Sequence, residues 1–285
     1  IFYFHDARDA VAPTLFIQNS FFEVHDFYKS KIRFINKWCF SRAKGLIVTN
    51  RIKLKDIRDE FGIREEGLLH QPNAVDIKKF SIQTTGEEAR KKIGLPADQK
   101  IILYTGHLFG WKGVGTLFEA HKFLSRREVI YFVGGGGEDL EKYEARRRDA
   151  NIQNIVMVGR RSHDEIPLWL RAADVLVLPS TAKDPASKYE TSPVKLFEYM
   201  ASGRPIVASR IPSIQDIVDD SMVWFFEPDN PGSLADAIHR ALDNRPKSND
   251  RAKLAADAVK KHNWEQRIKA IVDCINSNVK KPKVS

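Results

Sequence analysis

The strongest constraint on the fold of this chain is an alternation of short apolar runs with stretches of helical periodicity. Runs rich in β-branched residues predict strands, whereas apolar residues spaced three and four apart predict helices. The predicted strands are residues 14–17, 45–49, 101–105, 129–133, 155–158, 175–178, 205–208 and 222–225. Helices are predicted between them at 115–124, 139–149, 164–173, 193–201 and 233–242. This order is typical of βαβ units, so we expect an α/β fold with doubly wound parallel sheets.

The length of 285 residues predicts two lobes, because one hydrophobic core rarely serves so long a chain. A polar stretch at 81–99 separates a sparse first set of predicted strands from a fuller second set. We therefore expect a partial first lobe at residues 1–82 and a complete second lobe at 83–262.

The two ends of the chain carry further expectations. A helix predicted at 264–278, within a final segment 263–285, is expected to cross back to the first lobe. It is followed by a basic tail containing Lys280, Lys281 and Lys283. The chain opens on an apolar, strand-like run at Ile1 without an initiator methionine, so we expect the start of the first lobe to be missing.

Composition and charge narrow the class of protein and of partner. The chain is 42% hydrophobic and carries 46 Lys+Arg against 37 Asp+Glu, which excludes a disordered chain and gives a net charge of +9. Such an excess suits nucleic acid, an anionic membrane or a small anionic substrate. The sequence has no basic helix with interleaved aromatic residues and no nucleic-acid recognition motif, so we expect no nucleic-acid partner.

The expected location follows from what the sequence lacks. No apolar run reaches the roughly 18 residues of a membrane-spanning helix, and the first residues do not have a signal peptide's order. The two cysteines, Cys39 and Cys274, are too few for the disulfide framework of a secreted protein, and they lack Cys-x-x-Cys spacing. We therefore expect a reducing compartment and no structural zinc. We expect a cytoplasmic protein that is at most peripheral to the inner face of a membrane.

Glycine-rich segments follow three of the predicted strands, where parallel sheets bind their ligands. In 106–113, backbone N–H groups, a helix start and Lys112 suit a phosphate. Glycines fill 134–137, and Arg160 and Arg161 follow Gly159. Neither the P-loop spacing nor G-x-G-x-x-G is present. Each segment alone also fits a tight turn with solvated basic side chains.

The segment 189–203 carries the most chemical information. Thr191 or Ser192 suits an N-cap, Pro193 the first helical position and Gly203 the C′ position, which predicts a helix from Pro193 to Ser202. Glu190 precedes this helix and would lie beside its N-terminus, whose N–H groups attract phosphate.

One stripe of the predicted helix is polar. Lys195, Glu198 and Ser202 fall on it at helical spacing, and the stripe faces either solvent or a cleft. With Glu190 in the preceding loop, Glu198 could hold sugar hydroxyls on either side of a bound diphosphate. The alternative is two unrelated glutamates around an ordinary capped helix.

In this ordered set of motifs the chain resembles glycosyltransferase family 4, the retaining nucleotide-sugar glycosyltransferases of GT-B architecture with two Rossmann-like lobes. The resemblance covers nearly the whole chain, and the ordered set is specific although each piece is weak. The matching stretches are 71–76 with Phe80, 106–113, 133–137, 158–159, 173–180, 190–203, 205–209, 226–229 and 234–238.

The resemblance implies a role for each matching residue. Glu198 would accept hydrogen bonds from the donor's ribose, Glu190 would contact the transferred sugar, and Lys112 would neutralise the diphosphate leaving group. The remaining donor-binding candidates are Gly106, His107, Gly134, Arg160, Thr191, Ser192 and Val194. The chain contains no Asp-x-Asp pair, so we expect metal-independent transfer and no cofactor.

The chain departs from the family pattern at two places. Many relatives have arginine where His107 stands, and Arg160 is a candidate to replace that charge. Relatives often place a histidine after the strand that corresponds to 14–17, where this chain has Gln18 and Asn19. His5, at the end of an earlier strand, is another candidate for the cleft.

The resemblance implies a retaining transferase that moves a hexose-type sugar from a nucleoside diphosphate sugar to a hydroxyl of a glycan or of a lipid-linked acceptor. The incomplete first lobe leaves a second possibility, a nucleotide-sugar-binding or partner-binding module without catalysis.

Overall fold

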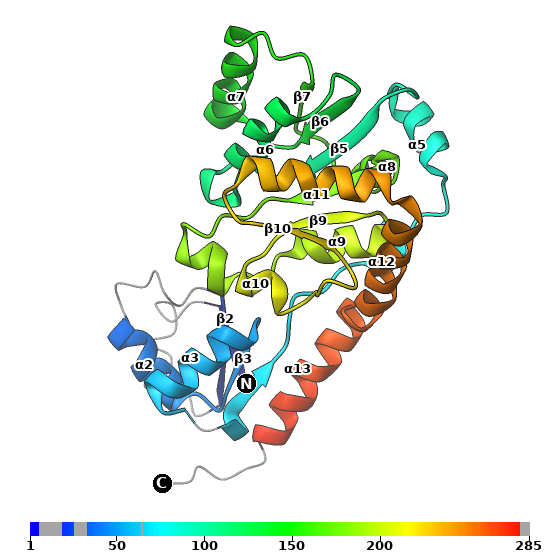
Figure 1. Ribbon diagram of the computed structural model, residues 1–285. Coiled ribbons are helices and arrows are strands. Elements are labelled where there is room, and N and C mark those ends of the chain that lie inside the picture. Colours follow the sequence, from blue (N-terminus) through cyan, green and yellow to red (C-terminus); the bar gives the residue numbers. More distant parts are fainter. Residues whose placement is uncertain (6–18, 26–32, 64, 280–285) are drawn as a thin grey trace.

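The computed structural model describes residues 1–5, 19–25, 33–63 and 65–279, which form two lobes, each built on a parallel sheet (Figure 1). The large sheet has the order β10-β9-β8-β5-β6-β7, from strands Lys100–Thr105 (β5), Glu128–Val133 (β6), Ile155–Gly159 (β7), Val175–Leu178 (β8), Ile206–Ser209 (β9) and Trp224–Phe226 (β10). The small sheet has the order β1-β2-β3-β4, from Phe2–Phe4 (β1), Ser20–Val24 (β2), Gly45–Val48 (β3) and Leu68–His70 (β4). The predicted α/β class with parallel sheets is confirmed.

The large sheet is buried on both faces. Successive residues of β5 enter opposite cores: Ile101 and Leu103 pack in one, Ile102 and Tyr104 in the other. This explains why the run is apolar at nearly every position. One face is covered by Gly86–Ile93 (α5), Ile166–Ala172 (α8), Val194–Ser202 (α9), Pro212–Gln215 (α10) and Arg245–Ala258 (α12). The other is covered by Val114–Ala120 (α6), Gly137–Asp149 (α7) and Pro231–Asp243 (α11).

The small sheet is covered by helices from both ends of the chain. Arg33–Arg42 (α2) and Arg51–Phe61 (α3) pack on one face through Phe40 and Ile57. On the other face Ile271, from the last described helix Trp264–Val279 (α13), packs against Phe21 and Ile47. The C-terminal helix thus forms part of the N-terminal lobe.

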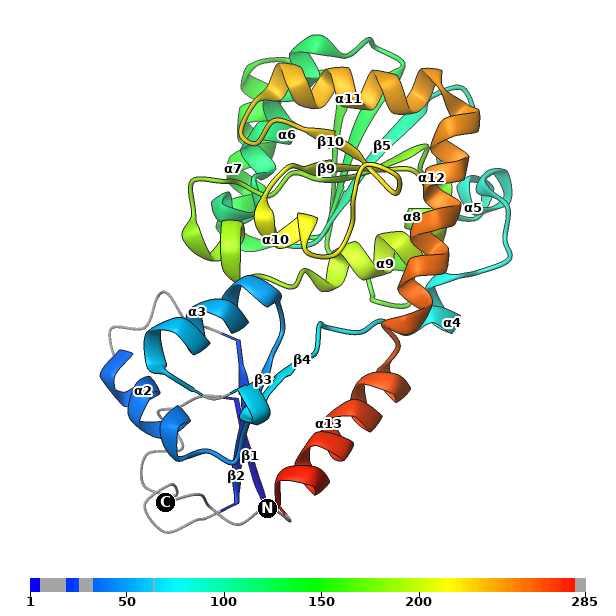
Figure 2. The same cartoon turned by 60° about the horizontal axis from the view of Figure 1, so that its bottom comes forward.

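The two connections between the lobes lie side by side (Figure 2). Val75, between β4 and Ile77–Phe80 (α4), donates its N–H to the carbonyl oxygen of His262 at 2.9 Å and forms a parallel bridge with Asn263. Val75 and Phe80 already pack in the core of the large lobe. The division of the chain at residue 82 stays a prediction.

The predicted elements of the large lobe are present, with most ends shifted by at most two residues. The helix predicted at 115–124 ends four residues early, at Ala120, and continues as a short 3₁₀ turn, His121–Phe123. The polar stretch 81–99, expected to separate the two strand sets, contains α5. Thr85 and Glu88 form a capping box at its start, and Arg90 pairs with Asp174 at 2.6 Å. The pattern was missed because a helix this short and charged shows little apolar periodicity.

Sequence reasoning predicted the small lobe less well. Strands β2 and β4 and helices α2 and α3 were not predicted, while the predicted strand at 14–17 lies outside the described residues. The tail with Lys280, Lys281 and Lys283 lies outside them as well.

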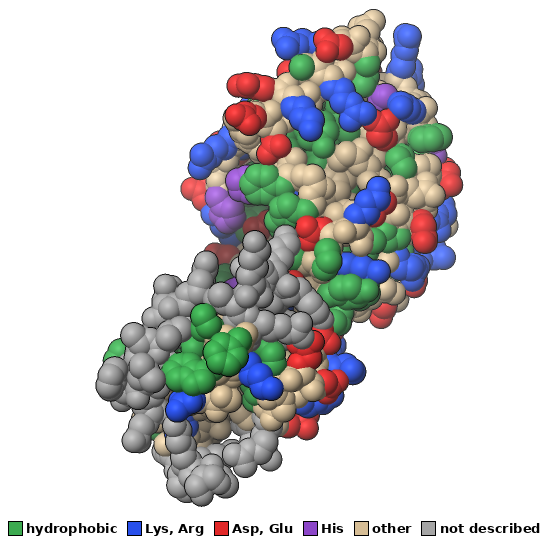
Figure 3. All heavy atoms as spheres, turned by 90° about the vertical axis from the view of Figure 1, so that its left-hand side faces the viewer, with side chains coloured by type: hydrophobic (Ala, Val, Ile, Leu, Met, Phe, Trp, Pro, Cys, Tyr) green, Lys and Arg blue, Asp and Glu red, His purple; other side chains and the backbone are tan. Residues whose placement is uncertain are grey.

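Acidic and basic side chains are interspersed over the large lobe on the face shown in Figure 3. The net positive charge is therefore not gathered into one patch on that face. Within the described part of the chain, no helix combines the length and apolar character needed to cross a membrane.

Candidate functional site

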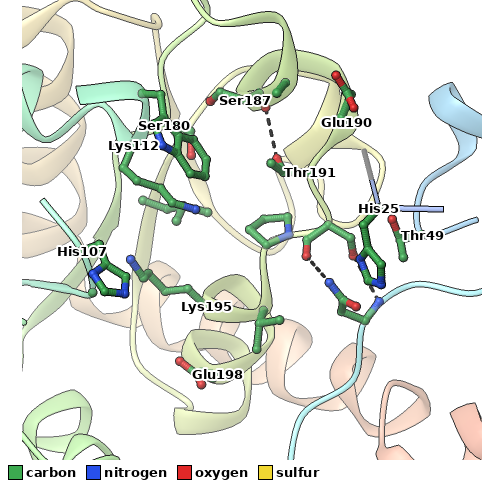
Figure 4. Close-up of a pocket in the computed structure, with 18 of the residues that line it drawn as sticks. His25, Thr49, His107, Lys112, Ser180, Ser187, Glu190, Thr191, Lys195 and Glu198 are labelled. Carbon is green, nitrogen blue, oxygen red and sulfur yellow. Dashed lines mark hydrogen bonds between the residues drawn. The ribbon is translucent and has the colours of Figure 1, made fainter. Parts of the chain in front are cut away.

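A pocket of about 490 Å³ lies where the two lobes meet, at the carboxyl ends of several strands (Figure 4). His25 and Thr49 line it from the ends of β2 and β3 in the small lobe. From the large lobe its lining includes Gly106, His107, Lys112, Ser180, Glu190, Thr191, Ser192, Val194, Lys195 and Glu198. The pocket thus contains most of the residues predicted from sequence, together with side chains from both lobes.

Gly106, directly after β5, lines the pocket and packs against the turn after β6. Gly106 has a φ of +121° and Gly134, after β6, a φ of +118°, so both suit glycine. A Cβ on Gly134 would lie 2.5 Å from the carbonyl oxygen of Gly106. The two turns therefore pack against each other, and Gly134 supports the lining residue Gly106 from behind. Gly134 does not itself line the pocket.

Lys112 reaches the pocket from a short turn, Gly110–Lys112, which ends at Gly113 in the left-handed conformation. Its Nζ lies 3.7 Å from the centre of the Trp111 ring. Burial lowers the pKa of Lys112 to about 8. An anionic ligand stabilises the charged form of such a lysine, because its negative charge compensates for the interactions with water that burial removes.

Lys195 supplies a second cation, which sequence reasoning placed on the polar stripe but did not identify as a ligand group. Its Nζ lies 4.0 Å from the centre of the Tyr104 ring. Burial, and secondarily the charge of Lys112, lower the pKa of Lys195 to about 7, whereas Glu198 opposes this shift. Of the predicted stripe, Lys195 and Glu198 line the pocket, but Ser202 is buried and donates to the Tyr199 carbonyl oxygen.

The two glutamates lie on different sides of the pocket (Figure 4). Glu190 is 3% exposed, at the end of the turn Ala186–Glu190 that precedes α9. Glu198, on α9, has Oε1 3.3 Å from Nε2 of His163. Two carboxylates separated by a helix N-terminus can accept hydrogen bonds from hydroxyl groups at two ends of one extended ligand.

The start of α9 differs from the prediction. Pro193 is the N-cap, without a side-chain hydrogen bond, and the helix begins at Val194; Gly203 ends it as predicted, with φ +65°. Thr191 instead donates to the Ser187 carbonyl oxygen at 3.2 Å. The N-cap prediction was wrong because the loop before α9 is held by the small-lobe side, where the backbone N–H of Asn73 donates to Ser192 Oγ.

Two asparagines of the small-lobe side hold that loop. Asn50 Nδ2 donates to the Tyr189 carbonyl oxygen at 2.6 Å, and Asn73 Nδ2 donates to that of Ser192, also at 2.6 Å. The backbone N–H of Asn73 also donates to Ser192 Oγ at 3.2 Å. Neither asparagine was a sequence candidate, because nothing in the sequence shows that these segments meet.

His25 is the histidine that sequence reasoning missed. The strand before it is β2, so His25 follows the strand, while Asn19 precedes it and accepts a hydrogen bond from the Phe2 N–H through its carbonyl oxygen. Asn19 therefore lies at the other end of β2, away from the pocket lining. The run from Phe21 to Val24 before His25 was a usable signal, but Glu23 interrupts its apolar pattern.

Of the remaining first-lobe and charge candidates, His5 and Arg160 lie outside the lining and His107 lies within it. His5 follows β1, with Nδ1 3.3 Å from Nε2 of His25. Arg160 is exposed after β7 and does not line the pocket. His107 lines it and stacks on Phe109, with ring centres 4.9 Å apart. Lys195, rather than Arg160, brings the second cation.

Among the described residues, one group of side chains has the types and spacing of a metal site. The ligand atoms of His5, Glu23 and His25 lie within 4.8 Å of one another. The two oxygens of Glu23 also accept hydrogen bonds from Tyr3 and Arg267.

The arrangement of the lobes is shared with known structures. Sucrose-phosphate synthase from Thermosynechococcus elongatus superposes with a TM-score of 0.83 at 21% identity, covering 97% of this chain and 73% of that one. The Anabaena protein HepE in complex with UDP and glucose gives 0.82 at 18% identity, covering 96% and 77%. These similarities establish a GT-B-type fold.

Sequence comparison gives relatives at modest identity. An uncharacterized glycosyltransferase of Methanocaldococcus jannaschii is 28% identical over 211 residues, 70% of this chain and 52% of the relative. A D-inositol 3-phosphate glycosyltransferase of Corynebacterium urealyticum is 26% identical, over 82% of this chain and 57% of the relative. The chain spans about half the length of these curated relatives.

The family model of glycosyl transferases group 1 matches residues 86–261. That stretch is well over half of the chain and contains the β5 turn, Lys112 and the whole of α9. The chain therefore belongs to the glycosyl transferases of group 1.

Proposed function

We propose that the chain is the catalytic part of a retaining glycosyltransferase. It would move a hexose-type sugar from a nucleoside diphosphate sugar to an acceptor hydroxyl of a glycan or a lipid-linked molecule, without a metal ion. The observation that carries the proposal is the convergence of Lys112 and Lys195 in a pocket that also holds Glu190 and Glu198.

The donor's diphosphate is assigned to the two lysines. Both have pKa values lowered by burial, so both gain most from an anion at short range. Glu198 then accepts hydrogen bonds from the ribose and Glu190 from the transferred sugar. The N–H groups of Ser192 and Val194 contact the sugar and the diphosphate, since they precede or open α9. The N–H of Thr191, also expected to bind the donor, instead donates to the Ala186 carbonyl oxygen at 3.1 Å.

The proposed reaction needs no carboxylate nucleophile. The bond between the anomeric carbon and the diphosphate oxygen breaks, and the acceptor oxygen attacks the same face. The acceptor's proton passes to the leaving diphosphate, whose growing negative charge Lys112 and Lys195 stabilise. Configuration at the anomeric carbon is thereby retained.

Several relatives support the choice of substrates. The solved HepE complexes are described with UDP, glucose and UDP-glucose. An alpha-monoglucosyldiacylglycerol synthase of Streptococcus pneumoniae is 22% identical over 81% of this chain, and its name describes a lipid product. These names favour a uridine diphosphate hexose as donor and a lipid-linked acceptor. A cytoplasmic protein in peripheral contact with an anionic membrane is part of our proposal, which the excess of basic residues supports. The non-catalytic alternative is not favoured, because the relatives are named as transferases.

The test is transfer with radiolabelled UDP-glucose to a panel of sugar and lipid acceptors, followed by NMR of the product's anomeric proton. We expect an α-linked product from an α-linked donor, formed equally with and without EDTA. A β-linked product would refute the retaining reaction, and loss of activity in EDTA that Mg²⁺ restores would refute metal independence. Failure of every nucleotide sugar to bind would refute the proposal as a whole.

A further inference from the structure

His25 contacts a hydrogen-bonded group of side chains formed by Glu23, Arg267 and Tyr3. Oε1 of Glu23 lies 3.1 Å from Nε2 of His25, and Nη2 of Arg267 donates to the same oxygen at 2.6 Å. The Tyr3 hydroxyl donates to the other oxygen of Glu23. These residues come from β1, β2 and α13, and Arg267 is separated from Glu23 by 244 positions in the sequence.

The two charged members of the set, Glu23 and Arg267, are buried and do not line the pocket. Glu23 is 4% exposed and Arg267 5%, whereas the side chain of His25 is 44% exposed. Burial opposes the ionisation of Glu23, but hydrogen bonds from His25 and Tyr3 and the charge of Arg267 outweigh it and lower the pKa of Glu23 to about 2. Glu23 is therefore a fixed hydrogen-bond acceptor at any ordinary pH.

Arg267 is fixed in turn. Its Nε donates to the carbonyl oxygen of Pro72, in the connection between the lobes, at 3.0 Å. Through Arg267, the C-terminal helix α13 thus contacts both Glu23, which lies next to His25, and Pro72 in the connection between the lobes. A guanidinium with both ends bonded holds a carboxylate in one orientation.

We propose that Glu23 and Arg267 are positioning residues that hold the ring of His25 with its proton on Nε2. Nδ1 then presents a lone pair to a hydroxyl group in the pocket, so His25 accepts a hydrogen bond rather than donating one. Which hydroxyl this is, on the donor sugar or on the acceptor, rests on the proposed function; the state of the ring does not.

A divalent cation held by His5, Glu23 and His25 is the competing interpretation of the same residues. Both oxygens of Glu23 already accept hydrogen bonds, and Arg267 supplies its countercharge. A cation bound to Glu23 would meet the guanidinium at short range, which costs Coulomb energy in a buried place. The observations therefore favour the positioning role.

The first experiment reads the ring directly. Long-range ¹H–¹⁵N NMR of histidine-labelled protein distinguishes the two neutral forms of each ring, and His25→Asn assigns the signal. We expect the Nε2-protonated form for His25 in the wild type and a mixture of both forms in Glu23→Gln. His5→Ala should leave the Nε2-protonated form in place.

The second experiment separates positioning from stability. Glu23→Gln should lower kcat by about tenfold or more while the donor Kd stays within about threefold, because Lys112 and Glu198 are untouched. Asp174→Asn removes a partly buried carboxylate that pairs with Arg90 in the large lobe, and it should leave kcat unchanged. Arg267→Lys should retain more activity than Arg267→Met. If Glu23→Gln does not fold, Glu23→Asp keeps the charge beside Arg267 but shortens the side chain that reaches Nε2 of His25, and it should shift the His25 ring forms in the same direction.

Three results would overturn the proposal: a wild-type His25 protonated on Nδ1, an unchanged ring in a folded Glu23→Gln or Glu23→Asp protein, or saturable Co²⁺ binding that His5→Ala abolishes. If the wild type transfers no sugar at all, the proposed function fails, while the NMR measurement still decides the state of His25.

Discussion

The ammonium group of Lys195 lies 4.0 Å from the centre of the Tyr104 ring, in the wall of the pocket that Lys112 enters from the opposite loop. Tyr104 is fully buried at the end of β5, and its hydroxyl donates to the His107 carbonyl oxygen at 2.7 Å. One aromatic residue thus supports a cation and orders the loop after β5. The aromatic face offsets part of the cost of burying the lysine, and an anionic ligand would offset the rest.

The first prediction concerns pH. In the protein without ligand the pKa values of Lys112 and Lys195 are lowered to about 8 and 7, so between pH 7 and 8 Lys195 is mostly neutral and Lys112 becomes so as pH rises further. A bound diphosphate favours the charged forms and raises both values. We therefore expect donor binding to take up protons near pH 8 and to weaken as pH rises from 7 to 9.

Calorimetric titration in buffers of different ionisation enthalpy measures this uptake. A nucleotide sugar is the suitable ligand, because its diphosphate has no group that titrates in this range. Proton release, or an affinity that does not change with pH, would contradict the assignment of the diphosphate to these lysines.

The second prediction separates ligand binding from stability. Lys195→Met keeps the length of the side chain and removes a charge that burial disfavours, so the unliganded protein should be at least as stable as the wild type. Donor affinity should fall by about 1.5–3 kcal/mol, the usual value of a charge-assisted hydrogen bond. Thermal unfolding with and without nucleotide sugar checks both.

Lys122→Met is the control for Lys195→Met, since Lys122 is exposed and pairs with Glu119 on the surface. A variant at Lys195 that unfolds more easily yet binds the donor normally would show that Lys195 is structural.

The third prediction compares two glycines of one loop. Gly134→Ala places a Cβ 2.5 Å from the Gly106 carbonyl oxygen at a φ of +118°, so it should cost about 1–3 kcal/mol and weaken donor binding by moving Gly106. Gly136 has an extended φ of 176° and open space at its Cβ, so Gly136→Ala should change little. Chemical denaturation of both variants measures the difference, and equal effects would contradict the packing of the two turns.

The fourth prediction concerns the contact between the lobes. Asn73→Ala removes the hydrogen bond from Asn73 Nδ2 to the Ser192 carbonyl oxygen, before α9, and leaves the bond from the Asn73 backbone N–H to Ser192 Oγ in place. We expect a loss of about 1 kcal/mol of stability and a reduced donor affinity, because the loop between Glu190 and α9 is held less firmly at Ser192. Amide hydrogen exchange at 189–194 should rise in this variant; unchanged exchange would mean that the loop is ordered by the large lobe alone.

The large lobe could be predicted from sequence because its signals are local. Runs such as Ile101 to Leu103 are apolar for the simple reason that both faces of the sheet are covered. The candidate site residues also lie close in sequence to the ends of these elements: glycines directly follow β5 and β6, and Glu190 and Glu198 lie just before and within α9. These patterns became an expectation of one donor site only together with the family resemblance, and the structure places Lys112 and Glu198 in one pocket.

What the sequence did not predict depends on contacts between distant segments. Glu23 interrupts the apolar pattern of β2, so the strand and His25 after it were missed. A charged residue is tolerated in this buried strand because Arg267 on α13 pairs with it, and the sequence does not show that pairing. The orientation of Lys195 depends on its contact with the ring of Tyr104. The start of α9 depends on Asn73, which holds Ser192 in the preceding loop. The polar residues of 81–99 conceal a helix whose partner is α8.

The central claim is that this pocket binds a nucleoside diphosphate sugar through Lys112 and Glu198. Calorimetric titration of the wild type, Lys112→Ala and Glu198→Ala with UDP-glucose and its guanosine and adenosine counterparts tests it most directly. The account predicts saturable binding of at least one donor by the wild type and a loss of about tenfold or more in each variant, with unchanged folding. Wild-type affinity in both variants would contradict it.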